Sequence, residues 1–209
     1  MKNNHSKSRR GGLPPDKYLS EEQVNKLKNH LDDQVETAAS TFGKKRAATT
    51  RMLIDVLLNS GLRFCEVTKL EMRDLPSHHN KLVINVRSGR FKVSRAVEVS
   101  STLASRLNTY IKTWRKSSKP NSRLFVNENG GALSYRSVHS KLKIVGQKSG
   151  IGNLTAHMLR HTFGTYLYRI EKDLYYVQDQ LGHAKPETTA IYAKTMSDDR
   201  RRQIEKLNL

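Results

Sequence analysis

The spacing of apolar residues divides this chain into helical segments around one stretch of different period. Ser20 and Gln23 have the spacing of a capping box, so a helix is expected to begin there. Gly61 is placed to end a longer helix, because glycine readily adopts the left-handed conformation of a C-cap. Together the helical periodicity and the end signals predict helices over about 20–32, 38–60, 63–71, 101–116, 134–148, 156–170, 173–181 and 196–207.

Residues 81–99 change to a period of two. Apolar residues alternate along the first half of this stretch, as in Leu82, Ile84 and Val86, and continue after the turn "SGRFK". This pattern is typical of a β-hairpin. A further short strand is expected at Leu124–Val126. The expected fold class is therefore mostly α with a small antiparallel β-sheet (α+β).

The chain is expected to form one domain over residues 19–209, preceded by a basic arm. Residues 1–18 carry five Lys or Arg and little apolar material, so we predict that they are disordered. Lys7, Arg9 and Arg10 in this arm are candidates for contacts with DNA phosphates. The arm would either lie along DNA or serve only as a solubilising tail.

The overall charge narrows the class of partner. The chain has 38 Lys and Arg against 19 Asp and Glu, a net charge of +19. Such an excess favours nucleic-acid binding over a merely solvated basic surface. Cys65 is the only cysteine, which excludes an internal disulfide, and we expect it to be a core residue. Without a signal peptide or a long apolar run, a cytoplasmic protein with no membrane partner is expected.

The last third of the chain holds the candidate chemistry. Arg160 follows His157 by three residues, which puts both on one face of a helix, beside an apolar stripe. His183 follows a helix end, and Tyr192 comes nine residues later. Taken singly, each has a commoner structural role, as a surface ion pair, a partly buried histidine or a core tyrosine. The stripe consists of Leu159, Phe163, Leu167 and Ile170.

Three motifs in a fixed order favour a catalytic role for these residues over the commoner structural ones. "SGLRFCEVTKL", "HMLRHTFGTYL" and "LGHAKPETTAIYA" together resemble the catalytic domain of the tyrosine recombinase (phage integrase) family. The spacing from Arg160 to His183 and from His183 to Tyr192 is also the family's. The resemblance covers residues 19–209 and adds Arg63, in the first motif, to the four candidate site residues.

The resemblance implies cleavage of one DNA strand by attack of a tyrosine on phosphorus, through a 3′-phosphotyrosine. Tyr192 is then the nucleophile. Arg63 and Arg160 would bind the non-bridging phosphate oxygens, since a guanidinium group matches phosphate and stays charged. His183 would donate a further hydrogen bond to the phosphate, and His157 would assist removal of the tyrosine proton.

Two further positions carry weaker assignments. Glu66 fits the family's acidic position and is expected to hold a basic or histidine partner in place. The leaving 5′ oxygen needs a proton, which a hairpin lysine supplies in the family. Lys92 is preferred to Arg90, because the pKa of arginine is too high for a general acid, and Arg90 is expected to bind DNA. Lys92 could instead touch phosphate only.

The expected partner is double-stranded DNA, bound by a homo-tetramer, with an accessory DNA-bending protein as a further expected partner. No cofactor is expected, because rejoining conserves the energy of the broken bond and no carboxylates cluster for magnesium. Typical family members carry a helical clamp domain before this one, and only the arm precedes Leu19 here. The chain thus resembles short members such as the fimbrial-switch invertases, or else it is a fragment of a longer protein. The tail helix would pack into a neighbouring subunit through Ile204 and Leu207, or fold back on its own domain.

Two other functions share these residues. A type IB topoisomerase-like nicking and closing enzyme would use the same chemistry with a different oligomeric state and less demand for sequence. A DNA-binding regulator would keep the basic surface without the chemistry. The complete set of Arg63, Lys92, His157, Arg160, His183 and Tyr192 favours a site-specific recombinase, which serves integration, excision or inversion.

Overall fold

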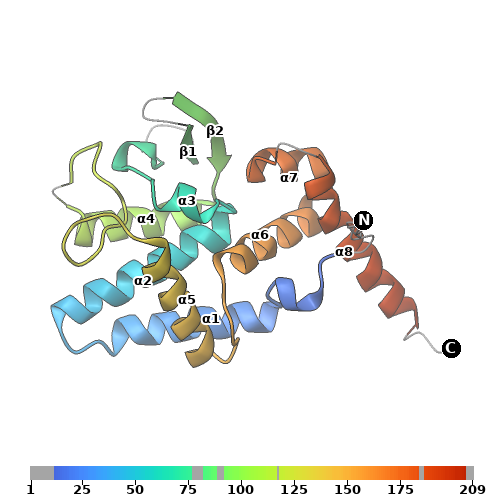
Figure 1. The fold of residues 1–209 in the computed structure, drawn as a ribbon, viewed down its shortest axis with the longest axis horizontal. Coiled ribbons are helices and arrows are strands. Elements are labelled where there is room, and N and C mark those ends of the chain that lie inside the picture. The colour runs from blue at the N-terminus through green and yellow to red at the C-terminus, as the bar shows by residue number, and fades with distance from the viewer. Residues whose placement is uncertain (1–11, 77–81, 89–91, 117, 184–185, 206–209) are drawn as a thin grey trace, which may run out of the picture.

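The computed structural model describes residues 12–76, 82–88, 92–116, 118–183 and 186–205, with the side chains of residues 88, 92, 93 and 196–205 left undescribed. Helices pack around α2, and a two-stranded sheet lies at one edge of the molecule (Figure 1). Over the described residues the predicted fold class is confirmed. The elements are a 3-10 helix η1 (Pro15–Lys17), α1 (Glu21–Glu36), α2 (Thr41–Ser60), α3 (Phe64–Val67), a 3-10 helix η2 (Met72–Asp74), β1 (Val83–Ser88), β2 (Lys92–Glu98), α4 (Ser101–Trp114), α5 (Tyr135–Lys148), α6 (Ala156–Glu171), α7 (Leu174–Leu181) and α8 (Pro186–Glu205).

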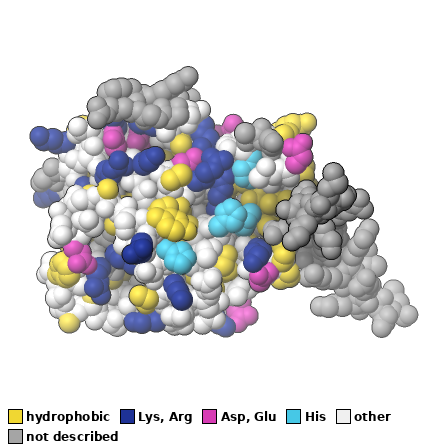
Figure 2. Space-filling model, viewed as in Figure 1, with side chains coloured by type: hydrophobic (Ala, Val, Ile, Leu, Met, Phe, Trp, Pro, Cys, Tyr) yellow, Lys and Arg dark blue, Asp and Glu magenta, His cyan; other side chains and the backbone are white. Residues whose placement is uncertain are grey.

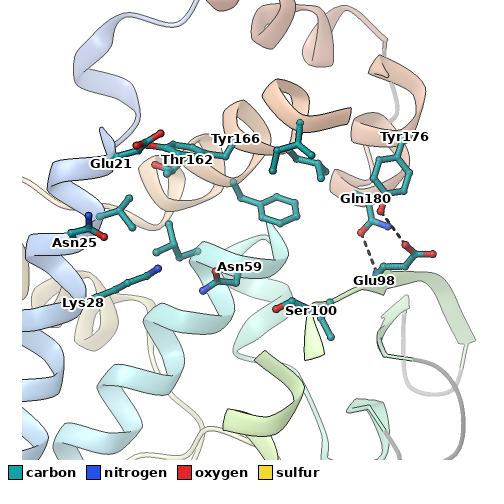
Figure 3. A pocket seen from close by; sticks show the side chains of 16 residues that line it. Glu21, Asn25, Lys28, Asn59, Glu98, Ser100, Thr162, Tyr166, Tyr176 and Gln180 are labelled. Atoms are coloured by element: carbon teal, nitrogen blue, oxygen red, sulfur yellow. Dashed lines mark hydrogen bonds between the residues drawn. The ribbon is translucent and has the colours of Figure 1, made fainter. Parts of the chain in front are cut away.

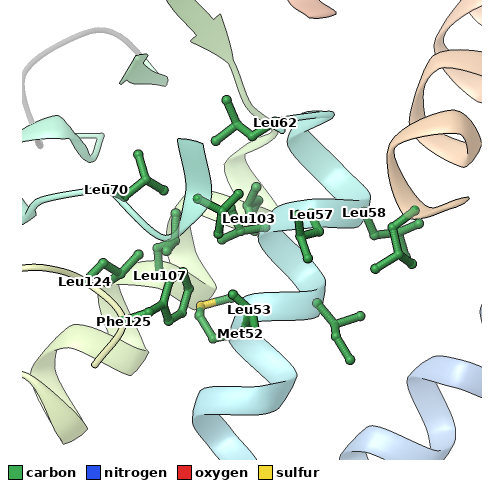
Figure 4. Close-up of a cluster of buried hydrophobic side chains, with 14 of the residues drawn as sticks. Met52, Leu53, Leu57, Leu58, Leu62, Leu70, Leu103, Leu107, Leu124 and Phe125 are labelled. Atoms are coloured by element: carbon green, nitrogen blue, oxygen red, sulfur yellow. The ribbon is translucent and has the colours of Figure 1, made fainter. Parts of the chain in front are cut away.

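The main core surrounds the second half of α2. This helix packs against α1, α4 and α6, and its residues from Met52 to Leu58 are all buried. Leu57, Leu62 and Phe125 are completely buried in this cluster, which Figure 4 shows in close-up. Burial of such side chains is the main favourable contribution to folding. The core therefore fixes α2 and the turn that follows it.

The predicted end signals of the first helices are confirmed. Ser20 and Gln23 form both hydrogen bonds of the capping box at the start of α1. Gly61 ends α2 with a φ of 62°, the left-handed conformation that glycine adopts at little cost. The predicted helix over 63–71 is wrong after Val67. There the chain turns to pair with a distant segment, since the backbone N–H of Leu124 donates to the carbonyl oxygen of Leu70.

The predicted hairpin is confirmed. β1 and β2 are antiparallel, with Ile84 opposite Val97, and the register shifts between Val86 and Arg87. The strand expected at Leu124–Val126 is wrong, because the structure has only isolated bridges there, from Arg123 to Glu71 and from Val126 to Ala132.

Both ends of the chain differ from expectation. The predicted separate helix over 196–207 is the second half of α8, which runs unbroken from Pro186. The prediction of disorder is wrong for residues 12–18, which include η1 and pack against α6 and α8. In Figure 1 the blue start of the described chain runs up to α8. Lys7, Arg9, Arg10, Leu207 and the side chain of Ile204 lie outside the described part.

No helix in the described part of the chain is long and apolar enough to cross a membrane.

Candidate active site

Two arginines from distant segments meet at the turn that follows α7. Arg63, at the N-cap of α3, donates from Nη2 to the carbonyl oxygen of Gly182 at 2.6 Å. Arg160, near the start of α6, donates from Nη2 to the carbonyl oxygen of Leu181 at 2.9 Å. Its Nη1 donates to the carbonyl oxygen of Gly61, the cap of α2. Carbonyls at the ends of two helices thus hold both guanidinium groups in place, an arrangement that suits a phosphate.

Arg160 is the more deeply placed of the two. Its residue is only 5% exposed, whereas the side chain of Arg63 is 43% exposed. Burial and the charge of Arg63 lower the pKa of Arg160 to about 10, which leaves it cationic at neutral pH. The site therefore keeps one buried positive charge and one that solvent reaches.

Glu66 holds the exposed arginine in place, as the sequence predicted. Its carboxylate accepts from the backbone N–H of Arg63 at 2.7 Å and from Arg63 Nη1 at 3.1 Å. Arg95 of β2 donates to both oxygens of the same carboxylate, at 2.9 and 3.0 Å. Burial raises the pKa of Glu66, but the hydrogen bonds from Arg95 and Arg63 outweigh it and lower the net pKa. Arg95 was not predicted, because the alternating hairpin pattern carries no signal for this contact.

His183 follows the same turn and is anchored by Thr189 of α8. The two side chains are joined by a hydrogen bond of 2.9 Å between Nδ1 and Oγ1. Burial and the charges of Arg160 and Arg63 lower the pKa of His183 to about 4, so the ring is neutral at pH 7. In the tautomer in which Nδ1 accepts from the threonine hydroxyl, the ring proton is on Nε2 and can be donated to a ligand.

Tyr192 lies on α8 beside this group but is completely buried. Its ring is stacked parallel to that of His183, with centroids 6.4 Å apart. Its hydroxyl is 3.2 Å from Nδ1 of His161. Gly164 makes room for the ring, because a Cβ there would lie 2.5 Å from Tyr192 Cζ. Burial raises the pKa of Tyr192 to about 12, although Arg160 opposes the shift.

His161, rather than the predicted His157, is the histidine that contacts the tyrosine hydroxyl. The two histidines are one helical turn apart, and their rings meet edge to face with centroids 4.1 Å apart. Burial and the charge of Arg160 lower the pKa of His157, and burial and His157 lower that of His161 to about 3. The missed signal was the i, i+4 spacing in "HMLRH". The predicted apolar stripe is also wrong at its end, since Ile170 is 75% exposed.

The two arginines, His157 and His183 line one cavity of about 700 Å³. None of the described residues that line it is Asp or Glu, so no lining carboxylate repels a bound anion. Figure 2, viewed in the same direction as Figure 1, shows histidine and Lys or Arg side chains gathered on one face. The other lining residues are Phe64, Cys65, Tyr135, His139, Leu142, Thr155, Ala156 and Thr188.

A second cavity, of about 580 Å³, lies between α1, α2, α6, α7 and β2 (Figure 3). Its lining includes Glu21 and Glu98, which disfavour a phosphate there. Glu98 accepts a hydrogen bond from the Tyr176 hydroxyl at 3.0 Å. The first cavity is therefore the better candidate for a phosphate.

Lys92 begins β2, but its side chain lies outside the described part of the structure, as does Arg90. Cys65 is exposed, which corrects the expectation of a core residue, and it lines the cavity of the arginines. Among the described residues, no three His, Cys, Asp or Glu side chains are grouped so as to hold a metal ion.

Comparison with known proteins agrees with these motifs. Residues 17–198 match the model of the phage integrase family. Tyrosine recombinase XerA of Pyrococcus horikoshii is 32% identical over 185 residues, which are 87% of this chain and 62% of that protein. Tyrosine recombinase XerC of Haemophilus ducreyi is 34% identical over 143 residues, 67% of this chain and 45% of that protein. The chain thus spans less than two thirds of the length of these relatives.

Solved structures show the same fold. The crystal structure of XerA recombinase has a TM-score of 0.72 and 26% identity, over 92% of this chain and 65% of that chain. The pre-cleavage complex of XerH site-specific recombinase with its difH substrate has a TM-score of 0.71 and 29% identity, over 87% of this chain and 51% of that one. With the family model covering most of its length and the arginine, histidine and tyrosine motifs brought together in space, this chain belongs to the phage integrase family, the tyrosine recombinases.

Proposed function

We propose that this protein is a site-specific DNA recombinase that breaks and rejoins strands through a covalent bond to Tyr192. The observation that carries the proposal is the convergence of Arg63, Arg160 and His183 on one turn, with Tyr192 beside them on the next helix. Similarity to XerA and to XerH bound to difH supports duplex DNA as the substrate. The net charge of +19 supports the same substrate.

The chemistry is a transfer between two phosphate esters. Tyr192 Oη attacks phosphorus and loses its proton, a 3′-phosphotyrosine forms, and the 5′ oxygen leaves with a proton. Arg63 and Arg160 neutralise the charge on the non-bridging oxygens, and Nε2 of His183 donates to one of them. Lys92 protonates the leaving oxygen, and Arg90, Lys7, Arg9 and Arg10 contact the DNA backbone.

Bound DNA would change the protonation of the site. Cations and burial depress the pKa of His183 in the DNA-free protein. A phosphodiester anion between the arginines offsets their charge, so the pKa of His183 rises on binding. The same anion favours a cationic His157, the residue that we propose to take the proton of Tyr192. In the observed geometry it is His161 that contacts the hydroxyl, so the transfer to His157 requires a rearrangement of Tyr192.

The remaining expectations belong to the same proposal. The reaction needs neither metal nor ATP, since the phosphotyrosine keeps the energy of the broken bond. Strand exchange takes place in a homo-tetramer on DNA, with an accessory DNA-bending protein. A DNA substrate agrees with a cytoplasmic location. The C-terminal part of α8, which carries Ile204, serves together with Leu207 as the contact between subunits.

A nicked DNA duplex tests the function directly. The nick, placed just beyond the cleavage point, lets the short released fragment diffuse away, so covalent protein–DNA product accumulates on a denaturing gel. DNA flanking the gene supplies the sequence. We expect a shifted band with the wild type and none with Tyr192→Phe. Covalent product from Tyr192→Phe would reject the nucleophile assignment. Tight, salt-sensitive binding without any product would favour a regulator, and product from a monomer on any sequence would favour a topoisomerase.

The general acid is tested with a sulfur atom in place of the leaving 5′ oxygen. A thiolate leaves without a proton, because the pKa of a thiol is far below that of an alcohol. Lys92→Ala should therefore fail on normal DNA and recover on the sulfur-containing DNA. Arg90→Ala is the matched control and should be weakened equally on both. Recovery of Arg90→Ala alone would move the role from Lys92 to Arg90.

A further inference from the structure

Tyr192 cannot react from its observed position. Its residue is completely buried, and it is absent from the described lining of the cavity that holds the two arginines. It packs in a small cluster with Val177 and Leu181, separate from the main core. For its hydroxyl to reach a phosphate in that cavity, α8 has to shift relative to α6.

Residues 12–19 tie those two helices together. The backbone N–H of Leu13 donates to Thr195 Oγ1 of α8 at 2.7 Å, and that of Leu19 donates to Thr162 Oγ1 of α6 at 2.9 Å. Each threonine hydroxyl also donates to the carbonyl oxygen four residues earlier in its own helix. Both threonines are 2% exposed. The segment is therefore held at each end by a buried hydroxyl, one on each helix.

The contact with α8 is a close approach of two backbones. A Cβ on Gly12 would lie 2.5 Å from both the N and Cα atoms of Thr195, so only glycine fits there without movement. Leu13, the next residue, packs against the cluster that contains Tyr192. A segment so placed opposes any shift of α8 away from α6.

The same segment also covers the histidine side of the tyrosine. Residues 13–18 line a cavity of about 600 Å³ together with His157 and His161. His161 is the hydrogen-bond partner of the Tyr192 hydroxyl. Release of the segment would thus free α8 to shift and would uncover His157 and His161.

We propose that residues 12–19 are a latch that holds α8 in a resting position with Tyr192 buried, and that DNA cleavage requires its release. This rests on the proposed function, in which Tyr192 is the nucleophile. The latch lowers the population of the reactive state and does not touch the substrate. Weakening it therefore speeds cleavage, whereas weakening an ordinary structural contact would slow it.

Two substitutions weaken the latch from opposite sides. Gly12→Ala adds a methyl group that meets the backbone of Thr195, and its φ is not in the left-handed range, so alanine adopts it freely. Thr195→Val removes the hydroxyl that accepts from Leu13 and keeps the shape of the side chain. Thr109→Val is the matched control, because its hydroxyl makes the same bond within α4 and has no latch contact.

The first measurement needs no DNA. Hydrogen–deuterium exchange followed by mass spectrometry reports how often the backbone of residues 188–195 opens. Gly12→Ala and Thr195→Val should raise exchange in this segment about fivefold, the factor that corresponds to one hydrogen bond, with no change in α2. The control should match the wild type. Wild-type exchange of residues 188–195 in both latch variants would overturn the proposal.

The second measurement is the rate of covalent product on the nicked duplex. Both latch variants should form product about fivefold faster than the wild type and the control. A slower rate with a lowered melting temperature would make the segment a structural brace and overturn the latch. If the wild type forms no product on any DNA, the proposed function fails, whereas the exchange measurement still decides whether residues 12–19 restrain α8.

Discussion

The arginines and the tyrosine of this site are attached to the protein in different ways. Arg63 and Arg160 donate to carbonyl oxygens at the ends of α2 and α7, and α2 is centred in the main core. Tyr192 belongs to a cluster with only two other fully buried apolar side chains among the described residues. The groups that would bind charge are thus preorganised, whereas the group that would react lies on a helix that can move at less cost.

Replacing Arg160 with Lys should have the largest effect on the arginine side of this comparison. A lysine cannot donate to Gly61, Leu181 and a phosphate together, because it lacks the planar fork. We expect covalent product to form about 10²–10³-fold more slowly, as when one donor to the transition state is lost. The rate is measured on the nicked duplex.

Arg169→Lys is the matched control for that change, since it alters the same residue type near the far end of α6. It should cleave within about twofold of the wild type, because it is remote from the phosphate donors. Near-normal cleavage by Arg160→Lys would remove that residue from the phosphate site.

The two clusters should also differ in stability. Leu57→Ala leaves a cavity in the main core and should lower the free energy of unfolding by about 3 kcal/mol. Val177→Ala, in the tyrosine cluster, removes fewer carbon atoms and should cost about 1.5 kcal/mol. Urea unfolding measures both. Only Val177→Ala should raise hydrogen exchange of α8 in the native protein, and equal exchange in both variants would show that the two clusters open as one.

Acid should act mainly on the tyrosine side. The pKa values of His161 and His183 are lowered to about 3 and 4 from 6.5, so the unfolded chain binds more protons than the folded one below pH 6.5. Stability is therefore present in full above that pH and is lost as the pH falls toward the folded values. From pH 7 to 5 we expect a loss of about 2 kcal/mol, allowing for partial solvent screening.

His161→Gln should flatten this pH dependence, because it removes one of the two shifted groups. His30→Gln, on α1, is the control and should keep the wild-type slope. A steep slope in both variants would mean that other groups cause the acid sensitivity.

The smallest effect is expected where α7 meets the hairpin. Tyr176→Phe removes the solvent-exposed hydrogen bond to Glu98 that Figure 3 shows. The loss should be about 0.5 kcal/mol in urea unfolding. A loss above about 2 kcal/mol would show that this contact is a main attachment of α7. The helices around Tyr192 would then be held more firmly than the small size of their hydrophobic cluster suggests.

The sequence predicted most elements because their end signals are local. The capping box at Ser20 and the C-cap at Gly61 act within a few residues, and the alternation along the hairpin is equally local. The helix predicted over 63–71 ended early because Leu70 pairs with Leu124, which no local pattern reveals. The order of residues 12–18 depends in the same way on hydroxyl groups far along the chain, those of Thr162 and Thr195.

The site residues show the same difference between local signals and long-range contacts. Motif spacing identified Arg63, Arg160, His183 and Tyr192, which the structure brings together. Spacing could not identify Arg95, because its partner Glu66 is 29 residues away and reaches it only through the fold. Nor could it show that Tyr192 is buried against Gly164, since that depends on how α8 lies on α6.

The unbroken course of α8 has a mechanical consequence. Tyr192 and Glu205 belong to one helix, so they are joined by a rod of about 20 Å rather than by a hinge. A helix transmits rotation along its length, because bending it would break backbone hydrogen bonds. Any force on the distal end of α8 thus arrives at the tyrosine as torque about the contacts with α6 and α7. The end of α8 at Glu205 and the tyrosine oxygen therefore move together as one rigid unit.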